Sequence, residues 1–192
     1  RTGDLKEGKV QLEQGNETIM TTEEIEGDAQ RFSVQYKQLP QDLEKGSQIL
    51  IDDGLIELKV KEVNGTEIKC EILNGGELGS RKGVNLPGVK VQLPALTEKD
   101  VSDIKFGIKQ GIHFIAASFT RKASDVLEIR KILEDENAED IKIIPKIENQ
   151  EAVDNIDEII EVSDGLMVAR GDLGVEIPAE RIPVIQKNIK KK

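Results

Sequence analysis

The stretch that decides the fold is residues 141–149, which read Ile-Lys-Ile-Ile-Pro-Lys-Ile-Glu-Asn. A short apolar run here leads directly into charged and polar residues. Two similar runs lie on either side of it. They are His113–Ala117, which is followed by Ser118, and Leu166–Ala169. Short apolar runs without alternation are typical of strands in a parallel sheet that is buried on both faces. The sequence therefore predicts three such strands in the second half of the chain.

Helical patterns separate these strands. Thr97 followed by Asp100 predicts an N-cap with an acidic residue at the third helical position. A second helix is expected to begin near Ser124, and Pro178 with Ala179 is expected to open the last one. Apolar residues then recur at helical spacing: Val101, Ile104 and Ile108; Val126, Ile129, Ile132 and Leu133; Val153, Ile156, Ile159 and Ile160; Ile182, Ile185 and Ile189. Strands that alternate with amphipathic helices predict an α/β fold.

The rhythm of strand and helix is that of a (β/α)₈ barrel, which needs roughly 250 residues. Residues 88–192 supply about three strands and four helices, too few to close a barrel. Two interpretations are open, an independent α/β sheet or a piece of a larger barrel. We favour the piece, because an all-β unit placed before barrel strands is otherwise hard to explain.

Residues 3–87 show the all-β pattern, in which apolar and polar residues alternate. A period of two predicts strands with one apolar face. The alternating sets are Phe32, Val34 and Tyr36; Ile56, Leu58 and Val60; Ile68, Cys70 and Ile72. Residues that tolerate positive φ separate the runs: Gly15-Asn16, Asp53-Gly54, Asn64-Gly65 and Asn74-Gly75-Gly76. We predict six or seven short strands that form a small barrel or sandwich.

Composition excludes several classes of protein. The formal net charge is -10, which argues against a nucleic-acid binder because phosphate contacts need a surplus of Lys and Arg. No apolar run reaches the roughly 20 residues of a membrane span. Cys70 is the only cysteine, so we expect a reducing, cytoplasmic location. Cys70 is interpreted as a core residue and His113 as a structural or solvated one.

Charged residues follow two of the predicted parallel strands, at the sheet edge where such folds place their functional groups. Lys146 and Glu148 are two positions apart and would face the same side, and Asp172 follows the next strand. Carboxylates beside substrate oxygens suit Mg²⁺ or Mn²⁺, and a lysine there would stabilise a phosphoryl group or an enolate. Gly171 and Gly174 would let the backbone approach a ligand. The alternative interpretation is an ordinary surface ion pair and a turn aspartate.

A basic pair, Arg81-Lys82, precedes Gly83. Such a pair is either a solvated turn or a loop that contacts phosphate groups, and the residues alone favour the turn.

Six motifs together resemble those of the pyruvate kinase family. They are Arg1-Thr2-Gly3, Ile-Asp-Asp-Gly-Leu-Ile at 51–56, Gly-Val-Asn-Leu-Pro-Gly at 83–88, Ala-Ser-Phe at 117–119, Pro-Lys-Ile-Glu-Asn at 145–149 and Met-Val-Ala-Arg-Gly-Asp-Leu-Gly at 167–174. They follow one another in the family's order through nearly the whole chain. Within the family, the sequence of residues 165–177 resembles that of the bacterial type of enzyme most.

The resemblance implies an α/β fold that is part of a TIM (β/α)₈ barrel with an inserted all-β barrel lid. Residues 1–2 would form the hinge at a barrel strand end, 3–87 the lid or B domain, and 88–192 a partial A domain. The enzyme would be a phosphotransferase of glycolysis that makes pyruvate and ATP from phosphoenolpyruvate and ADP.

The family's functional residues map onto the matching motifs. Lys146 corresponds to the catalytic lysine, which also binds substrate. Glu148 and Asp172 correspond to the divalent-metal ligands, and Gly171 and Asp172 to substrate contacts. Arg1 and Lys82 correspond to residues that contact the nucleotide in the family. Ser118 corresponds, more weakly, to a residue near the metal.

The chain also departs from the family pattern. The family's Asn-Phe-Ser-His segment with its potassium ligands, its Ala-Thr-Gln-Met segment and its C-terminal regulatory domain have no counterpart here. We therefore expect a section of a longer enzyme, which the family implies to be a potassium-dependent homotetramer without nucleic-acid or membrane partners. Two alternatives stay open: a metal-dependent lyase or aldolase acting on a pyruvate-like substrate, or an inactive module that only binds metal or nucleotide.

Overall fold

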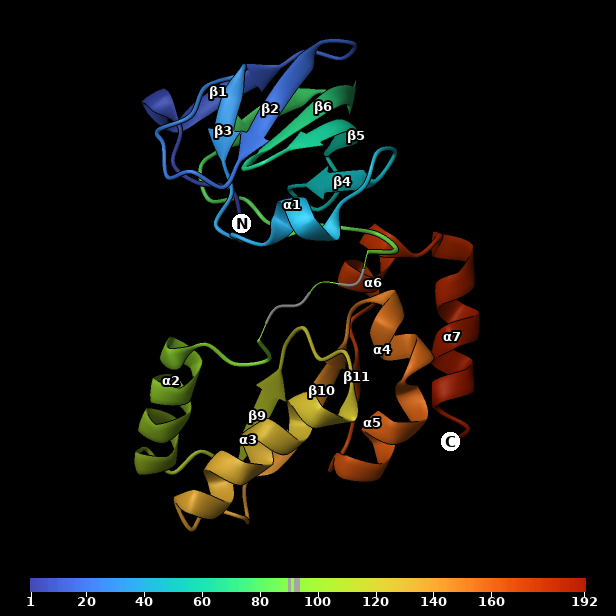
Figure 1. Cartoon of the computed structure of the whole chain (residues 1–192). Helices are drawn as coiled ribbons and strands as arrows, with labels where there is room; N and C mark the ends of the chain where they lie inside the picture. Colours follow the sequence, from blue (N-terminus) through green and yellow to red (C-terminus); the bar gives the residue numbers. More distant parts are fainter. Residues whose placement is uncertain (90, 92–93) are drawn as a thin grey trace. The chain divides into compact units, whose positions relative to one another are not determined.

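The chain forms two compact units, Arg1–Gln92 and Leu93–Lys192, each with a hydrophobic core of its own. The computed structural model (Figure 1) describes residues 1–89, 91 and 94–192. Within these ranges no helix is long and apolar enough to cross a membrane.

The first unit is built from short β-strands. Its described elements are the 3₁₀ turn Lys6–Gly8, β1 (Lys9–Leu12), β2 (Glu17–Thr21), β3 (Arg31–Ser33), α1 (Leu39–Asp42), β4 (Gln48–Ile51), β5 (Ile56–Asn64), β6 (Glu67–Asn74), β7 (Gly76–Gly79) and β8 (Val84–Asn85). Six strands form one sheet in the order β3-β2-β6-β5-β4-β8, and β1 pairs with β7 in a separate ribbon. The sequence prediction of six or seven strands was therefore too low.

The alternation of apolar residues accounts for the central hairpin of this sheet. In β5 and β6 the residues Leu58, Val60, Cys70 and Ile72 are buried, and the antiparallel register places Leu58 opposite Ile72 and Val60 opposite Cys70. Gly65, at φ +60°, lies in the tight turn between the two strands. Cys70 is fully buried in the hydrophobic core, which confirms it as a core residue, and this burial raises the pKa of its thiol to about 12.

Two local predictions in this unit were wrong. The run through Phe32 and Tyr36 is not one strand, because β3 ends at Ser33 and the next residue only bridges to Thr2. Gly75 does not provide a positive φ. It is required by a close approach, since a Cβ on Gly75 would lie 2.3 Å from the carbonyl oxygen of Leu12.

This contact makes Gly75→Ala a sharp test of the packing. The added methyl group would collide with backbone, so we expect the substitution to lower the free energy of unfolding by about 2 to 3 kcal/mol. The neighbouring Gly76→Ala is the matched control, because its Cβ would lie 3.8 Å from Ile56, an ordinary contact. Equal losses for the two variants in urea denaturation would contradict this assignment.

The second unit contains a three-stranded parallel sheet with helices. Its elements are α2 (Glu98–Lys109), β9 (Phe114–Ala117), α3 (Ala123–Asp135), β10 (Lys142–Ile147), α4 (Gln150–Asp154), α5 (Ile156–Val162), β11 (Met167–Val168), α6 (Arg170–Glu176), the 3₁₀ turn Ala179–Arg181 and α7 (Ile182–Ile189). The strand order is β11-β10-β9, with both pairs parallel (Figure 1). This confirms the predicted α/β class.

The helix boundaries differ from the prediction in three places. The capping box of Thr97 and Asp100 is present, as expected. However, the third predicted helix is interrupted at Asn155, whose amide donates to the carbonyl of Arg121. The segment after β11 forms the additional helix α6, and the residues expected to open the last helix form a 3₁₀ turn instead.

The strands are not buried on both faces within the described residues. In β10, Ile143, Pro145 and Ile147 are buried, whereas Ile144 and Lys146 are half-buried. The apolar stripes of the helices therefore cover one face of β10. Lys146 lies on the other face.

Asp164 fastens the connection between α5 and β11 to the sheet. Its Oδ2 atom accepts hydrogen bonds from the backbone N–H of Ile143 at 2.9 Å and from Arg130 at 2.7 Å. The pKa of Asp164 is lowered, first by the Ile143 N–H and then by Arg130. Because the folded-state pKa is depressed, its stabilisation is present above the ordinary pKa of 3.8 and is lost as pH falls through the lower, folded-state value.

We therefore expect Asp164→Asn to destabilise the protein at neutral pH by about 1 to 2 kcal/mol and to flatten the loss of stability below pH 3.8. The exposed Asp135 of α3 serves as the control, because Asp135→Asn removes the same charge without these bonds. Thermal unfolding measured across the acidic range checks this prediction. An unchanged pH profile in Asp164→Asn would refute the assignment.

Candidate active site

Lys146 is the centre of a cluster at the carboxyl end of the parallel sheet. It lies on β10, and its Nζ atom forms an ion pair with Glu148 Oε1. The same atom lies 4.0 Å from Asp172 Oδ2 and donates a 3.4 Å hydrogen bond to Ser118 Oγ. The structure thus brings together four residues that the sequence predicted, from the ends of β9, β10 and β11.

Glu148 is the buried member of the cluster, with 5% of its surface exposed. One carboxylate oxygen pairs with Lys146, and the other accepts a 2.9 Å hydrogen bond from the backbone N–H of Phe119. A buried carboxylate is costly unless both oxygens find partners. These two contacts satisfy that need and fix the direction of the carboxylate.

Phe119 was missed by sequence reasoning, because its contribution is a backbone N–H. Its φ of +55° is unusual for a bulky residue and marks local strain. The loop is held in this shape by Thr120, whose hydroxyl donates to Ala117, and by Asn149, whose amide donates to the carbonyl of Thr120. The strain is thus maintained next to the predicted active site, where strained residues tend to cluster.

The cluster keeps Lys146 charged. Its pKa is raised, first by the hydrogen bond to Glu148, with a further contribution from the negative charges of Glu148 and Asp172, while desolvation acts in the opposite direction. Lys146 is therefore a cation throughout the neutral range. In this state it can stabilise negative charge.

Asp172 and Gly171 lie in the first turn of α6, shortly after the end of β11. Asp172 remains beside Lys146, but its side chain is 60% exposed. A Cβ on Gly171 would meet nothing within 4 Å, whereas one on Gly174 would lie 3.2 Å from Ile182. Packing against α7 therefore accounts for Gly174, and the first-turn N–H groups of α6 have no partner within the helix.

The donor set fits a hard divalent cation. No group of three or more His, Cys, Asp or Glu side chains is arranged to hold a metal within residues 1–89, 91 and 94–192. Glu148 and Asp172, however, both face one cationic atom, the Lys146 Nζ. Mg²⁺ commonly uses one or two carboxylates together with substrate oxygens and water, so these two residues suit it.

In the first unit, the structure brings the predicted nucleotide contacts Arg1 and Lys82 onto adjacent segments. The Arg1 guanidinium donates to the carbonyl of Arg81 at 3.1 Å, and the backbone N–H of Thr2 donates to the carbonyl of Lys82 at 2.9 Å. The Lys82 ammonium itself is paired with Asp52. The sequence indicated Asp52 only as part of a motif and gave it no role.

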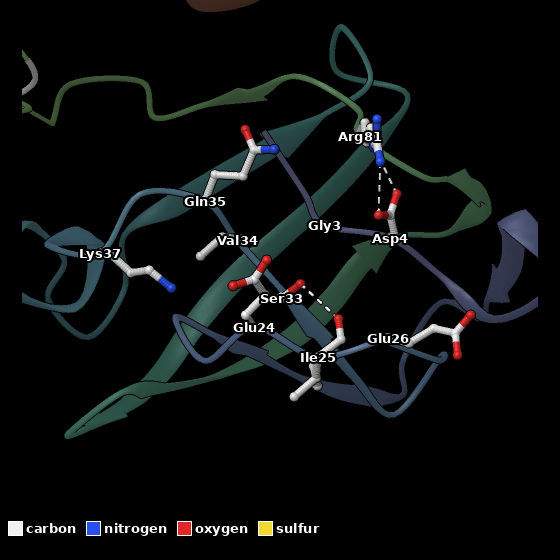
Figure 2. A pocket seen from close by; sticks show the side chains of 10 residues that line it. All are labelled: Gly3, Asp4, Glu24, Ile25, Glu26, Ser33, Val34, Gln35, Lys37 and Arg81. Carbon is white, nitrogen blue, oxygen red and sulfur yellow. Dashed lines mark hydrogen bonds and ion pairs between the residues drawn. The ribbon is translucent and has the colours of Figure 1, made fainter. Parts of the chain in front are cut away.

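Arg81 is engaged elsewhere. It forms a two-point ion pair with Asp4, at 2.8 and 3.0 Å, at the edge of a pocket in the first unit (Figure 2). The hydrogen bond with Arg81 lowers the pKa of Asp4. The pocket measures about 620 Å³ and is lined by residues 3–4, 24–26, 33–35, 37 and 81. Of these, only Arg81 belongs to a candidate site of the sequence analysis, the basic pair Arg81-Lys82.

Comparisons with known proteins agree with the motifs. The family model described as "Pyruvate kinase, barrel domain" matches residues 1–192. The chain is 60% identical over 191 residues to pyruvate kinases of Staphylococcus aureus strains MRSA252 and USA300, covering 98% of this chain and 32% of theirs. A crystal structure of a pyruvate kinase from Cryptosporidium parvum is similar with a TM-score of 0.92 and 42% identity, over 100% of this chain and 40% of that one. The chain thus spans about a third of the length of the curated relatives it matches.

Proposed function

The chain belongs to the pyruvate kinase family, and on this premise we propose that its protein transfers the phosphoryl group of phosphoenolpyruvate to ADP. In this reaction the bond between phosphorus and the enol oxygen breaks, and a bond to a β-phosphate oxygen of ADP forms. The enolate that remains takes up a proton at its methylene carbon to give pyruvate. The arrangement of Lys146 between Glu148, Asp172 and Ser118 is the observation that carries this proposal.

Lys146 would supply a fixed positive charge at the reacting groups. Phosphoryl transfer asks little covalent chemistry of a protein, so that positioning and electrostatic stabilisation dominate. Because Glu148 orients the ammonium and keeps it protonated, Lys146 is prepared to stabilise charge on the transferring phosphoryl group and on the enolate. Ser118, bonded to the same ammonium, would help to fix its direction.

Glu148 and Asp172 would hold Mg²⁺ or Mn²⁺. The bound ion would supply neutralising charge at the phosphate and carboxylate oxygens of the substrate. The chain's own part is to direct the two carboxylates, the one of Glu148 through the N–H of Phe119. The N–H of Gly171, in the first turn of α6, would contact the substrate. No residue of this chain is assigned to potassium.

The first unit would serve as a lid over the active site of a larger barrel, with residues 1–2 as the hinge, 3–87 as the lid and 88–192 as part of the (β/α)₈ barrel. The pairing of Thr2 with Lys82 supports this division, because it brings the start of the insertion beside a residue that lies five positions before its end. Arg1 and Lys82 would contact the nucleotide phosphates. The glycolytic role, the homotetramer and the cytoplasmic location stay predictions from the resemblance.

The test is the dependence of pyruvate formation on ADP. We expect the intact protein to release pyruvate from phosphoenolpyruvate only when ADP and a divalent cation are both present, as followed by a lactate dehydrogenase assay. Pyruvate release without ADP would favour a lyase or aldolase instead. Metal and ADP binding without any turnover would indicate a binding module.

A further inference from the structure

Within the first unit, Lys82 is held from three directions. Its backbone N–H donates to the hydroxyl of Thr2 at 2.9 Å, and Thr2 is fully buried. Its ammonium lies 3.0 Å from Oδ1 and 2.9 Å from Oδ2 of Asp52. Its stem passes Gly79, where a Cβ would lie 3.0 Å from the Lys82 Cε atom. Backbone, stem and charge are therefore all placed before any ligand is bound.

The sheet register places Asp52 beside Lys82. Strands β4 and β8 pair so that Ile51 lies opposite Val84, and the backbone N–H of Asp52 continues this ladder to the carbonyl of Gly83 at 3.1 Å. Asp52 then turns away at φ +54°, a conformation that aspartate tolerates. The backbone position of Asp52 is thus set by the sheet and not by the lysine.

The ion pair has little to contribute to folding. The side chain of Lys82 is 40% exposed and that of Asp52 is 22% exposed, so solvent screens their attraction. A lysine side chain has many rotamers, and ordering it when a ligand binds weakens the binding. A carboxylate that orders the ammonium in advance removes that cost.

We propose that Asp52 is a positioning residue for nucleotide binding, which holds the ammonium of Lys82 where the phosphate groups of a nucleoside diphosphate meet it. This inference rests on the proposed function, in which Lys82 contacts the nucleotide. The alternative is that the Asp52 carboxylate competes with phosphate for the lysine. In that case, removal of the carboxylate would strengthen nucleotide binding.

The experiment measures the affinity of the intact protein for ADP by isothermal titration calorimetry, so that it does not depend on turnover. Lys82→Ala should raise the dissociation constant about tenfold or more, as expected for the loss of a charged hydrogen bond. Asp52→Gly deletes the carboxylate and is compatible with the positive φ. It should raise the dissociation constant about fivefold, and Asp52→Asn, which keeps an acceptor oxygen, should raise it less.

The double variant shows whether Asp52 acts through the lysine. In the Lys82→Ala background, Asp52→Gly should change the ADP dissociation constant less than about twofold. The exposed neighbour Asp53, also at positive φ, provides the matched control. Asp53→Asn removes the same charge and should leave ADP binding unchanged, and thermal unfolding of each variant checks that the fold is retained.

The possible negative results of the ADP-binding experiment overturn different proposals. Unchanged ADP binding in Lys82→Ala would overturn the nucleotide contact of the proposed function, and the inference with it. Weaker binding in Lys82→Ala but not in Asp52→Gly would overturn the positioning role alone. Tighter binding in Asp52→Gly, or an equal effect with and without the lysine, would overturn it as well.

Discussion

Lys146→Met should reduce the rate of phosphoryl transfer about 10³-fold or more, because it removes the cation that Glu148, Asp172 and Ser118 hold in place. Methionine has a similar length and no charge, so that the loss reports the charge and not the volume. Steady-state rates of pyruvate and ATP formation measure it. The divalent cation should still bind, because both carboxylates remain.

Two results would contradict this prediction. A variant with nearly normal turnover would remove Lys146 from the mechanism. Loss of Mn²⁺ binding together with turnover, observed by electron spin resonance, would mean that the substitution had disturbed the carboxylates. Lys142→Met is the matched control, because Lys142 lies on the same strand and the same face, four residues earlier, with an exposed side chain. It should retain full activity.

The second large effect concerns the carboxylates. Glu148→Gln and Asp172→Asn should each weaken Mn²⁺ binding at least tenfold, roughly the loss seen when even an outer partner of a metal ligand is removed. The glutamine keeps an oxygen that can accept from the N–H of Phe119, so the fold should survive. Asp172 is 60% exposed, and its replacement should leave thermal stability unchanged.

A control variant in the same unit distinguishes the loss of a metal ligand from the loss of any one negative charge. Glu161→Gln removes one exposed carboxylate from α5 and should not affect Mn²⁺ binding. If Glu148→Gln and Asp172→Asn both bind Mn²⁺ as the unmodified protein does, these residues are not the metal site. Removal of the metal by a chelator should abolish turnover in the unmodified protein and leave its thermal unfolding nearly unchanged.

The parts of the structure that were predictable from the sequence are those set by local pattern. The period of two in β5 and β6 gave the hairpin, and the spacing of Thr97 and Asp100 gave the capping box. Lys146 and Glu148 could be placed together because residues two apart on a strand share a face. Asp172 could be placed near them because parallel strands end at one edge.

Other features depend on tertiary packing and could not be predicted. Helix α6 begins Arg-Gly-Asp-Leu-Gly, and its two glycines weaken helix propensity. It forms around Leu173, which is fully buried, with Gly174 packed close to Ile182 of α7. No periodic signal in so short a segment could reveal this contact.

Contacts made by backbone groups, and pairs of residues far apart in the chain, could not be predicted from the sequence either. The N–H of Phe119 that orients Glu148 carries no signature in the residue type. Asp52 and Lys82 are 30 residues apart, and only the register of β4 with β8 brings them together. The sequence shows Asp52 as a motif residue. Its proposed role could be inferred only from the register of β4 with β8, which places it beside Lys82.

The fate of the phosphoryl group tests the central claim most directly. Phosphoenolpyruvate labelled with ³²P would be mixed with excess intact protein, Mg²⁺ and ADP, and the products separated after a single turnover. We predict that the label is recovered in ATP, in an amount equal to the pyruvate formed, and that Lys146→Met leaves it in phosphoenolpyruvate. Label released as inorganic phosphate, or label left unreacted by the unmodified protein, would contradict a phosphotransferase built on Lys146, Glu148 and Asp172.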